Sequence, residues 1–179
     1  MKTYNLHVAG LTRTLPIIRI TDNLSIASFV VLGDTALITA ASPLLAKKLP
    51  EVDVLITAEA KGIPFVHELS KELGMDSYIV ARKSVKPYMQ DPFVHKVVSI
   101  TTQKEQTLCL DRKDAEKLQG KRVALIDDVI STGESMRALE ELVIQAGADV
   151  KARAAILAEG EAADREDIIY LEKLPVFID

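Results

Sequence analysis

The chain has 179 residues, of which 48% are hydrophobic and 27% charged, and its 22 Lys and Arg stand against 26 Asp and Glu. This length suits one domain with its own core, so we expect a single domain over residues 1–179. The mildly acidic balance disfavours nucleic acid as a partner, and no apolar run reaches the roughly 18 residues of a membrane span. With no signal-peptide pattern and one cysteine, Cys109, the sequence predicts a cytoplasmic protein.

In the first half of the chain, short apolar runs alternate with helical patterns, which is typical of an α/β fold with parallel crossovers. A strand is predicted over residues 28–32, and a helix capped by Asp34 follows it. The run 53–57 has the length and β-branched content of a buried parallel strand. A turn then opens a helix that carries Pro64 in its first turn and ends at Gly74.

The second half continues this alternation, with strands predicted over residues 77–81, 97–100, 107–110, 123–126 and 151–157. The strands at 97–100 and 107–110 could pair as a hairpin. The segment 84–95 is rich in turn formers, and loops of this length in a compact domain are usually functional or mobile. The pattern therefore predicts a mostly parallel central sheet flanked by helices.

Two carboxylates and a loop of small polar residues follow the strand at 123–126. The carboxylates are Asp127 and Asp128, and the loop is Ser131, Thr132, Gly133, Glu134 and Ser135. Ligands of open α/β sheets bind beyond the carboxyl ends of the strands, where a helix N-terminus offers N–H groups to a phosphate. The acids suit ribose hydroxyls or a Mg²⁺ ion bound to them. Acids at a helix start are also ordinary caps, so each part alone leaves both interpretations open.

Together, residues 123–135 (VALIDDVISTGES) resemble the signature that binds phosphoribosyl pyrophosphate (PRPP) in type I phosphoribosyltransferases, above all the purine members. The similarity covers roughly residues 26–160 and departs at Glu134, where adenine enzymes usually have Gly. It implies the type I phosphoribosyltransferase fold, with a flexible loop and a small hood from the N-terminal segment and the C-terminal end. It also implies that Asp127 and Asp128 are catalytic and contact the cofactor Mg²⁺ indirectly, through PRPP hydroxyls or water, while residues 131–135 bind the 5′-phosphate.

Two further segments fit the resemblance. The turn Glu59-Ala60-Lys61-Gly62 is similar to the family's pyrophosphate loop, which often contains a cis non-proline peptide. A basic cluster follows the next strand, as in adenine enzymes: Arg82, Lys83 and Lys86. The resemblance implies that both segments hold the pyrophosphate, with Lys61 and Arg82 among the catalytic groups. Local sequence alone fits a plain turn and solvated cations equally well.

The identity of the base is the open point of the resemblance. Residues 98–104 look like the hood strands of xanthine-type relatives and lack the Glu-Tyr pair of adenine enzymes. The family often reads the base with backbone groups and one apolar wall, for which Val80 and Phe65 are candidates. We expect a homodimeric salvage enzyme that acts on PRPP and a purine base, with adenine favoured and no nucleic acid or membrane partner. The alternatives are a xanthine or guanine enzyme and a non-catalytic PRPP sensor.

Overall fold

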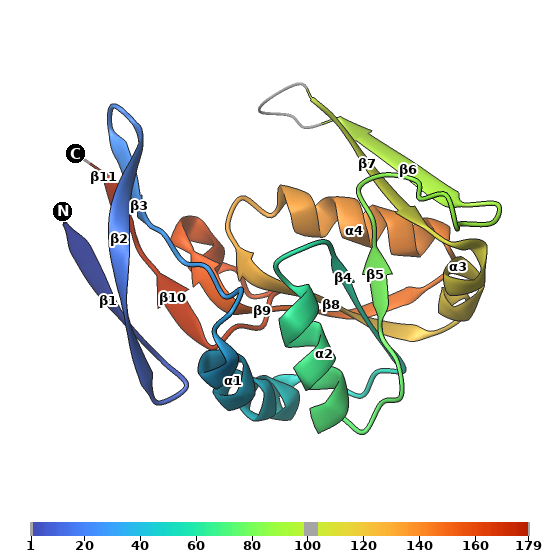
Figure 1. Cartoon of the computed structure of the whole chain (residues 1–179), viewed down its shortest axis with the longest axis horizontal. Coiled ribbons are helices and arrows are strands. Elements are labelled where there is room, and N and C mark those ends of the chain that lie inside the picture. The colour runs from blue at the N-terminus through green and yellow to red at the C-terminus, as the bar shows by residue number, and fades with distance from the viewer. Residues whose placement is uncertain (1, 99–103, 179) are drawn as a thin grey trace.

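A five-stranded parallel sheet forms the centre of the molecule in the computed structural model, which describes residues 2–98 and 104–178 (Figure 1). Its order is β10-β9-β8-β4-β5, and every neighbouring pair is parallel. The strands are β4 (Val54–Ala58), β5 (Ile79–Ala81), β8 (Arg122–Ile130), β9 (Asp149–Glu159) and β10 (Glu172–Leu174). The predicted α/β class and parallel central sheet are confirmed.

Helices cover both faces of this sheet because its central strands are apolar on both sides. Along β8, Ala124 and Ile126 belong to one core cluster, whereas Val123 and Leu125 belong to the other. The first cluster includes residues of α1 (Thr35–Lys48) and α2 (Ile63–Glu72), and the second includes residues of α3 (Arg112–Leu118) and α4 (Glu134–Gln145). A side-chain period of two therefore directs alternate residues of one strand into two cores.

The local signals of the first two helices act as expected. Asp34 caps α1 by accepting a hydrogen bond from the Leu37 N–H at 3.1 Å, and it also pairs with Arg13 at 2.7 Å. Pro64 lies in the first turn of α2, where the missing N–H would have had no helical partner. Gly74 has a φ of +68° beyond the end of α2, a conformation that favours glycine.

A second sheet, antiparallel throughout, stands at one end of the central sheet (Figure 1). It joins three strands from the start of the chain to one from its end. These strands are β1 (Thr3–Val8), β2 (Leu11–Thr21), β3 (Leu24–Ala27) and β11 (Val176–Ile178). The ion pair between Arg13 on β2 and Asp34 links this sheet to the start of α1.

The predicted pairing is present as β6 (Phe93–Val98) and β7 (Glu105–Leu110), an antiparallel hairpin beside α4 (Figure 1). Strand β6 begins four residues earlier than predicted, so residues 93–95 belong to the hairpin and not to the preceding loop. Residues 99–103 of the predicted hood segment lie outside the described part of the chain. Residues 84–92 join β5 to this hairpin without a helix or strand. None of the helices in the described parts of the chain is both long and apolar enough to cross a lipid bilayer.

The strand predicted over residues 28–32 is wrong. The strand there is β3, which ends at Ala27, and residues 28–32 run on without helix or strand toward α1. Burial still alternates along this segment, since Phe29 and Val31 are buried while Val30 and Leu32 are about half exposed. The pattern is that of a strand, but in the described part of the chain only the Ser28 N–H bonds to a neighbouring strand, donating to the Pro16 carbonyl of β2 at 2.9 Å, and residues 29–32 form no ladder.

Candidate functional site

A cavity of about 860 Å³ lies at the carboxyl ends of β4, β8 and β9. Its walls combine charged, hydroxyl and apolar side chains from segments far apart in the sequence. They include Glu59, Ala60, Lys61, Lys83, Asp127, Asp128, Ser131, Ser135 and Glu159, with Ile26–Val30, Leu32, Leu174 and residues 105–108 of β7. This is the edge at which open α/β sheets bind ligands.

The acid pair on β8 lines this cavity, with Asp128 buried and Asp127 partly buried. Asp127 Oδ1 accepts a hydrogen bond from the Asp128 N–H at 2.8 Å, and Asp128 is only 6% exposed. Burial raises the pKa of the Asp127 carboxyl, and the neighbouring Asp128 carboxyl raises it further, while Lys61 acts in the opposite direction. Such a site is poor for two lone negative charges, and it favours a ligand that brings hydroxyl donors or positive charge.

The loop after the acids forms a smaller hollow of about 50 Å³, lined by Asp127, Val129–Gly133, Ser135 and Met136. Gly133 is the N-cap of α4 and has a φ of +83°. Because it is a glycine, it has no side chain that could cap the first helical N–H groups. Thr132 Oγ1 lies 3.4 Å from the Glu134 N–H. The hydroxyl groups of this loop, the backbone N–H groups of the first helical turn and the positive end of the helix dipole suit a phosphate group.

Arg165 borders this loop, and sequence reasoning missed it. A Cβ atom added at Gly133 would lie 2.7 Å from Arg165 Nη1. The guanidinium is held by Asp167, which accepts from Nε at 2.8 Å and from Nη2 at 2.7 Å. Arg165 directly follows the short 3-10 helix η1 (Gly160–Asp164), about thirty residues after the loop, so no local motif announces the contact.

The turn after β4 packs tightly against the acid pair. Its Glu59–Ala60 peptide bond is cis, as the family resemblance implied. A Cβ atom at Gly62 would collide with Thr57 Oγ1 and lie 3.5 Å from Asp127 Cα, so only glycine fits here. This close approach places Ala60 and Lys61 on the cavity wall next to Asp127.

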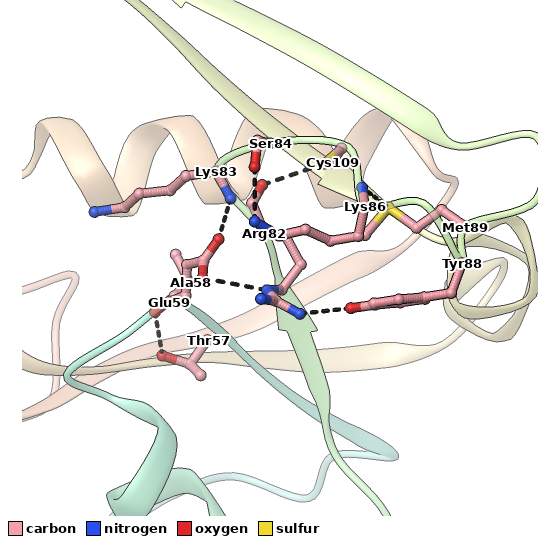
Figure 2. A network of polar contacts seen from close by, with 10 residues as sticks. All are labelled: Thr57, Ala58, Glu59, Arg82, Lys83, Ser84, Lys86, Tyr88, Met89 and Cys109. Atoms are coloured by element: carbon pink, nitrogen blue, oxygen red, sulfur yellow. Dashed lines mark hydrogen bonds and ion pairs between the residues drawn. The ribbon is translucent and has the colours of Figure 1, made fainter.

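The basic cluster after β5 divides into one residue that reaches the cavity and two that do not. Arg82 Nε lies 3.2 Å from Glu59 Oε2, an ion pair without hydrogen-bond geometry, and its Nη1 donates to Tyr88 Oη at 2.6 Å (Figure 2). Lys86 Nζ donates to Ser84 Oγ at 2.7 Å. Figure 2 shows the Lys83 side chain extending away from this cluster. Lys83 lines the cavity, whereas Arg82 and Lys86 do not.

Glu59 holds this cluster together. One carboxylate oxygen, Oε1, accepts a hydrogen bond from the Lys83 N–H at 2.6 Å, and the other, Oε2, faces Arg82 (Figure 2). The Lys83 N–H and then Arg82 lower the pKa of the Glu59 carboxyl. The turn after β4 is thus fixed to the end of β5, which keeps Lys61 and Lys83 on the same cavity.

The apolar wall of the cavity consists of other residues than the candidates Val80 and Phe65. It is formed by residues 26–30, Leu32 and Leu174, and neither Val80 nor Phe65 lines the cavity. Phe65 is fully buried within the core between α2 and the sheet. The sequence feature that could have indicated this wall was the apolar run at 28–32, which we interpreted as a strand.

The sequence and the fold match those of known proteins. The model of the phosphoribosyl transferase domain family matches residues 35–175. The chain is 30% identical over 120 residues to a xanthine phosphoribosyltransferase from Exiguobacterium sp., covering 66% of this chain and 61% of that protein. It is 32% identical over 128 residues to an adenine phosphoribosyltransferase from Corynebacterium jeikeium, covering 72% and 58%. The chain thus spans less than two thirds of the length of these relatives.

A solved structure also resembles this chain, over a larger share of both chains. An adenine phosphoribosyltransferase from Thermoanaerobacter pseudethanolicus superimposes with a TM-score of 0.69 at 25% identity, covering 89% of this chain and 95% of that one. The family model, over residues 35–175, includes the central sheet, its helices, the acid pair and residues 131–135. This chain therefore belongs to the phosphoribosyl transferase domain family.

Proposed function

We propose that the protein transfers the 5-phosphoribosyl group of PRPP to a purine base, adenine above all, and releases pyrophosphate and a nucleoside 5′-monophosphate. The observation that supports this proposal is one cavity in which the acid pair adjoins both the N-terminal end of α4 and two lysines. Relatives named adenine and xanthine phosphoribosyltransferase support a purine acceptor. The solved adenine phosphoribosyltransferase supports adenine.

In this proposal different residues of the cavity bind different chemical groups of PRPP. Residues 131–135 bind the 5′-phosphate, Asp127 and Asp128 accept hydrogen bonds from the ribose hydroxyls, and Lys61 and Lys83 neutralise the pyrophosphate. Fixing both reactants in line removes much of the entropic barrier, and cations near the leaving group stabilise its developing charge. The base nitrogen then forms a bond to C1′ as the bond from C1′ to the pyrophosphate oxygen breaks.

Arg82 has a different part from the one its position in the sequence implied. Since Glu59 and Tyr88 hold its guanidinium outside the cavity lining, we propose that Arg82 fixes the Glu59 turn rather than contacting the pyrophosphate. Lys86, bonded to Ser84, reaches the pyrophosphate only if the segment after β5 moves when PRPP binds.

Mg²⁺ fits this site as an ion carried in with the substrate. Within residues 2–98 and 104–178, no group of three or more His, Cys, Asp or Glu could hold a metal, so the protein offers no complete cage. Mg²⁺ commonly binds through one or two carboxylates together with substrate phosphates and water, and Asp127 and Asp128 suit that use. When bound, the ion would offset negative charge on the pyrophosphate.

The test is a pyrophosphate-release assay with PRPP, Mg²⁺ and single bases, run on the purified protein. We expect release with at least one purine and none without a base. Asp127→Asn should lower turnover roughly 10- to 100-fold, as expected from losing a hydrogen bond to a charged group. Binding of PRPP without pyrophosphate release for any base would instead favour a sensor. We further propose a cytoplasmic homodimer, which size-exclusion chromatography with light scattering can check for its oligomeric part.

A further inference from the structure

One acid of the cavity has no place in the proposed handling of PRPP. Glu159 is the last residue of β9, and it lies across β8 from the turn that carries Lys61. Two strand spacings of about 4.8 Å separate β9 from β4, so Glu159 lies roughly 10 Å from the pyrophosphate side of the cavity. Its carboxylate therefore faces a different part of the substrates.

Three other acids of the cavity have a partner, and Glu159 has none in the described part of the chain. Glu59 is bonded to the Lys83 N–H, Glu105 is paired with Lys96 at 3.1 Å, and Asp127 accepts the Asp128 N–H. Within the described ranges, no hydrogen bond or ion pair joins the Glu159 carboxylate to another residue. Its pKa is raised, and burial is the cause. The Glu159 side chain is partly buried and lines the cavity, so its carboxylate oxygens are available to N–H groups of a ligand.

The surroundings of Glu159 are those of a site for a flat, mostly apolar ring. Glu159 is in register with Leu174 of β10, and a Cβ atom at the next residue, Gly160, would lie 3.3 Å from Val176. Val176 is in turn the register partner of Ile26, where the apolar wall begins. Glu159 and the apolar residues 26–30, Leu32 and Leu174 therefore line neighbouring parts of this cavity.

Val30 and Leu32 provide apolar surface against which a ring could pack. Both side chains line the cavity, yet they are 55% and 46% exposed, so large apolar groups are left open to solvent. A purine ring placed against them would bury that surface, while its polar edge would meet Glu159. Ligand sites commonly combine an apolar lining with a few polar groups that fix orientation.

We propose that Glu159 selects the base by accepting a hydrogen bond from its exocyclic amino group, so that amino-substituted purines are used in preference to hypoxanthine and xanthine. An ionised carboxylate is an acceptor only, and it repels a carbonyl oxygen at the same place. A site built around a buried hydrogen bond discriminates strongly against analogues that lack the matching group. This inference rests on the proposed purine phosphoribosyltransferase function and names its acceptor class.

The experiment measures kcat/KM for adenine, guanine, hypoxanthine and xanthine by pyrophosphate release at pH 8, in the wild type, Glu159→Gln and Glu161→Gln. Glu161 is exposed and does not line the cavity, so it is a matched control. The wild type should prefer its best amino purine over hypoxanthine and xanthine by at least roughly tenfold, the value of a hydrogen bond to a charged group. Glu159→Gln should reduce that ratio by a similar factor, because an amide can also donate to a carbonyl, and Glu161→Gln should leave it unchanged.

The KM for PRPP in Glu159→Gln checks that the fold and the phosphate half of the cavity are intact. Should that variant fold poorly, Glu159→Asp keeps the charge, moves it away from the base, and should lower kcat/KM for amino purines selectively. Equal use of all four bases by the wild type, or an unchanged ratio in both Glu159 variants, would overturn the inference. No release with any base would instead refute the proposed function.

Discussion

Replacing Asp127 with asparagine should make the protein more stable while it loses turnover. The carboxyl lies buried beside Asp128, and burial raises its pKa in the folded state. In the unfolded chain an aspartate loses its proton near pH 3.9. Between these two pKa values the folded state binds more protons than the unfolded state, so the free energy of unfolding falls as pH rises. Asparagine does not titrate, so it avoids this loss.

The size of the effect follows from proton linkage. One proton difference changes the free energy of unfolding by about 1.4 kcal/mol per pH unit. Asp127→Asn should therefore gain up to about 2.7 kcal/mol over the wild type between pH 5 and pH 7, with less at the lower end of the window. The Asn Oδ1 can still accept the Asp128 N–H, so the substitution keeps the observed hydrogen bond.

Urea unfolding of both proteins at pH 5, 6 and 7 measures this difference directly. Asp22→Asn, on an exposed turn, controls for the loss of one acidic side chain elsewhere. A stability difference that stays constant with pH, or that shrinks as pH rises, would refute the reasoning that burial of Asp127 opposes its ionisation. Saturating PRPP with Mg²⁺ should narrow the difference, because the ligand supplies partners to the wild-type carboxylate.

Three further predictions concern residues that support the elements around the site. Gly62→Ala should destabilise the fold by about 1–3 kcal/mol, the usual cost of overpacking, and Thr57→Ala should recover part of that loss in thermal unfolding, since Thr57 Oγ1 is the colliding atom. Asp34→Ala should cost about 1 kcal/mol as a lost N-cap, and Asp34→Asn should cost less; equal losses in urea unfolding would assign the effect to the Arg13 pair. Gly133→Ala should destabilise by about 1–2 kcal/mol because its φ is positive, and it should raise the KM for PRPP; an unchanged KM would separate this loop from the phosphate.

The sequence predicted the parts of the site that lie within one short segment. Strand β8, its two acids and the loop to α4 form a continuous stretch, and chain geometry alone brings Asp127 close to Ser131 and Ser135. The turn at Glu59 was also readable, because it directly follows a buried strand. In each case the residues that act together are neighbours in the chain.

The remainder depends on tertiary contacts that no local pattern encodes. Residues 28–32 have the alternation of a strand, and only the folded chain, in which residues 29–32 form no ladder, shows that they line a cavity instead. The resemblance implied that Arg82 contacts the pyrophosphate, and only the folded chain shows that the carboxylate of Glu59, from another loop, pairs with it and that Arg82 does not line the cavity. Arg165 reaches the phosphate loop because β9 runs parallel to β8 and delivers the residues after it to the same edge.

The segment 26–32 and the segment 127–135 meet only in the folded molecule, and each supplies a separate wall of the cavity. Under the proposed function, changes in the first segment would alter which base is accepted without disturbing the binding of PRPP. Related enzymes could then evolve a preference for another base through changes in the segment 26–32 and at Glu159, the last residue of β9. The same division offers protein engineers a place to graft new preferences onto an unchanged donor site.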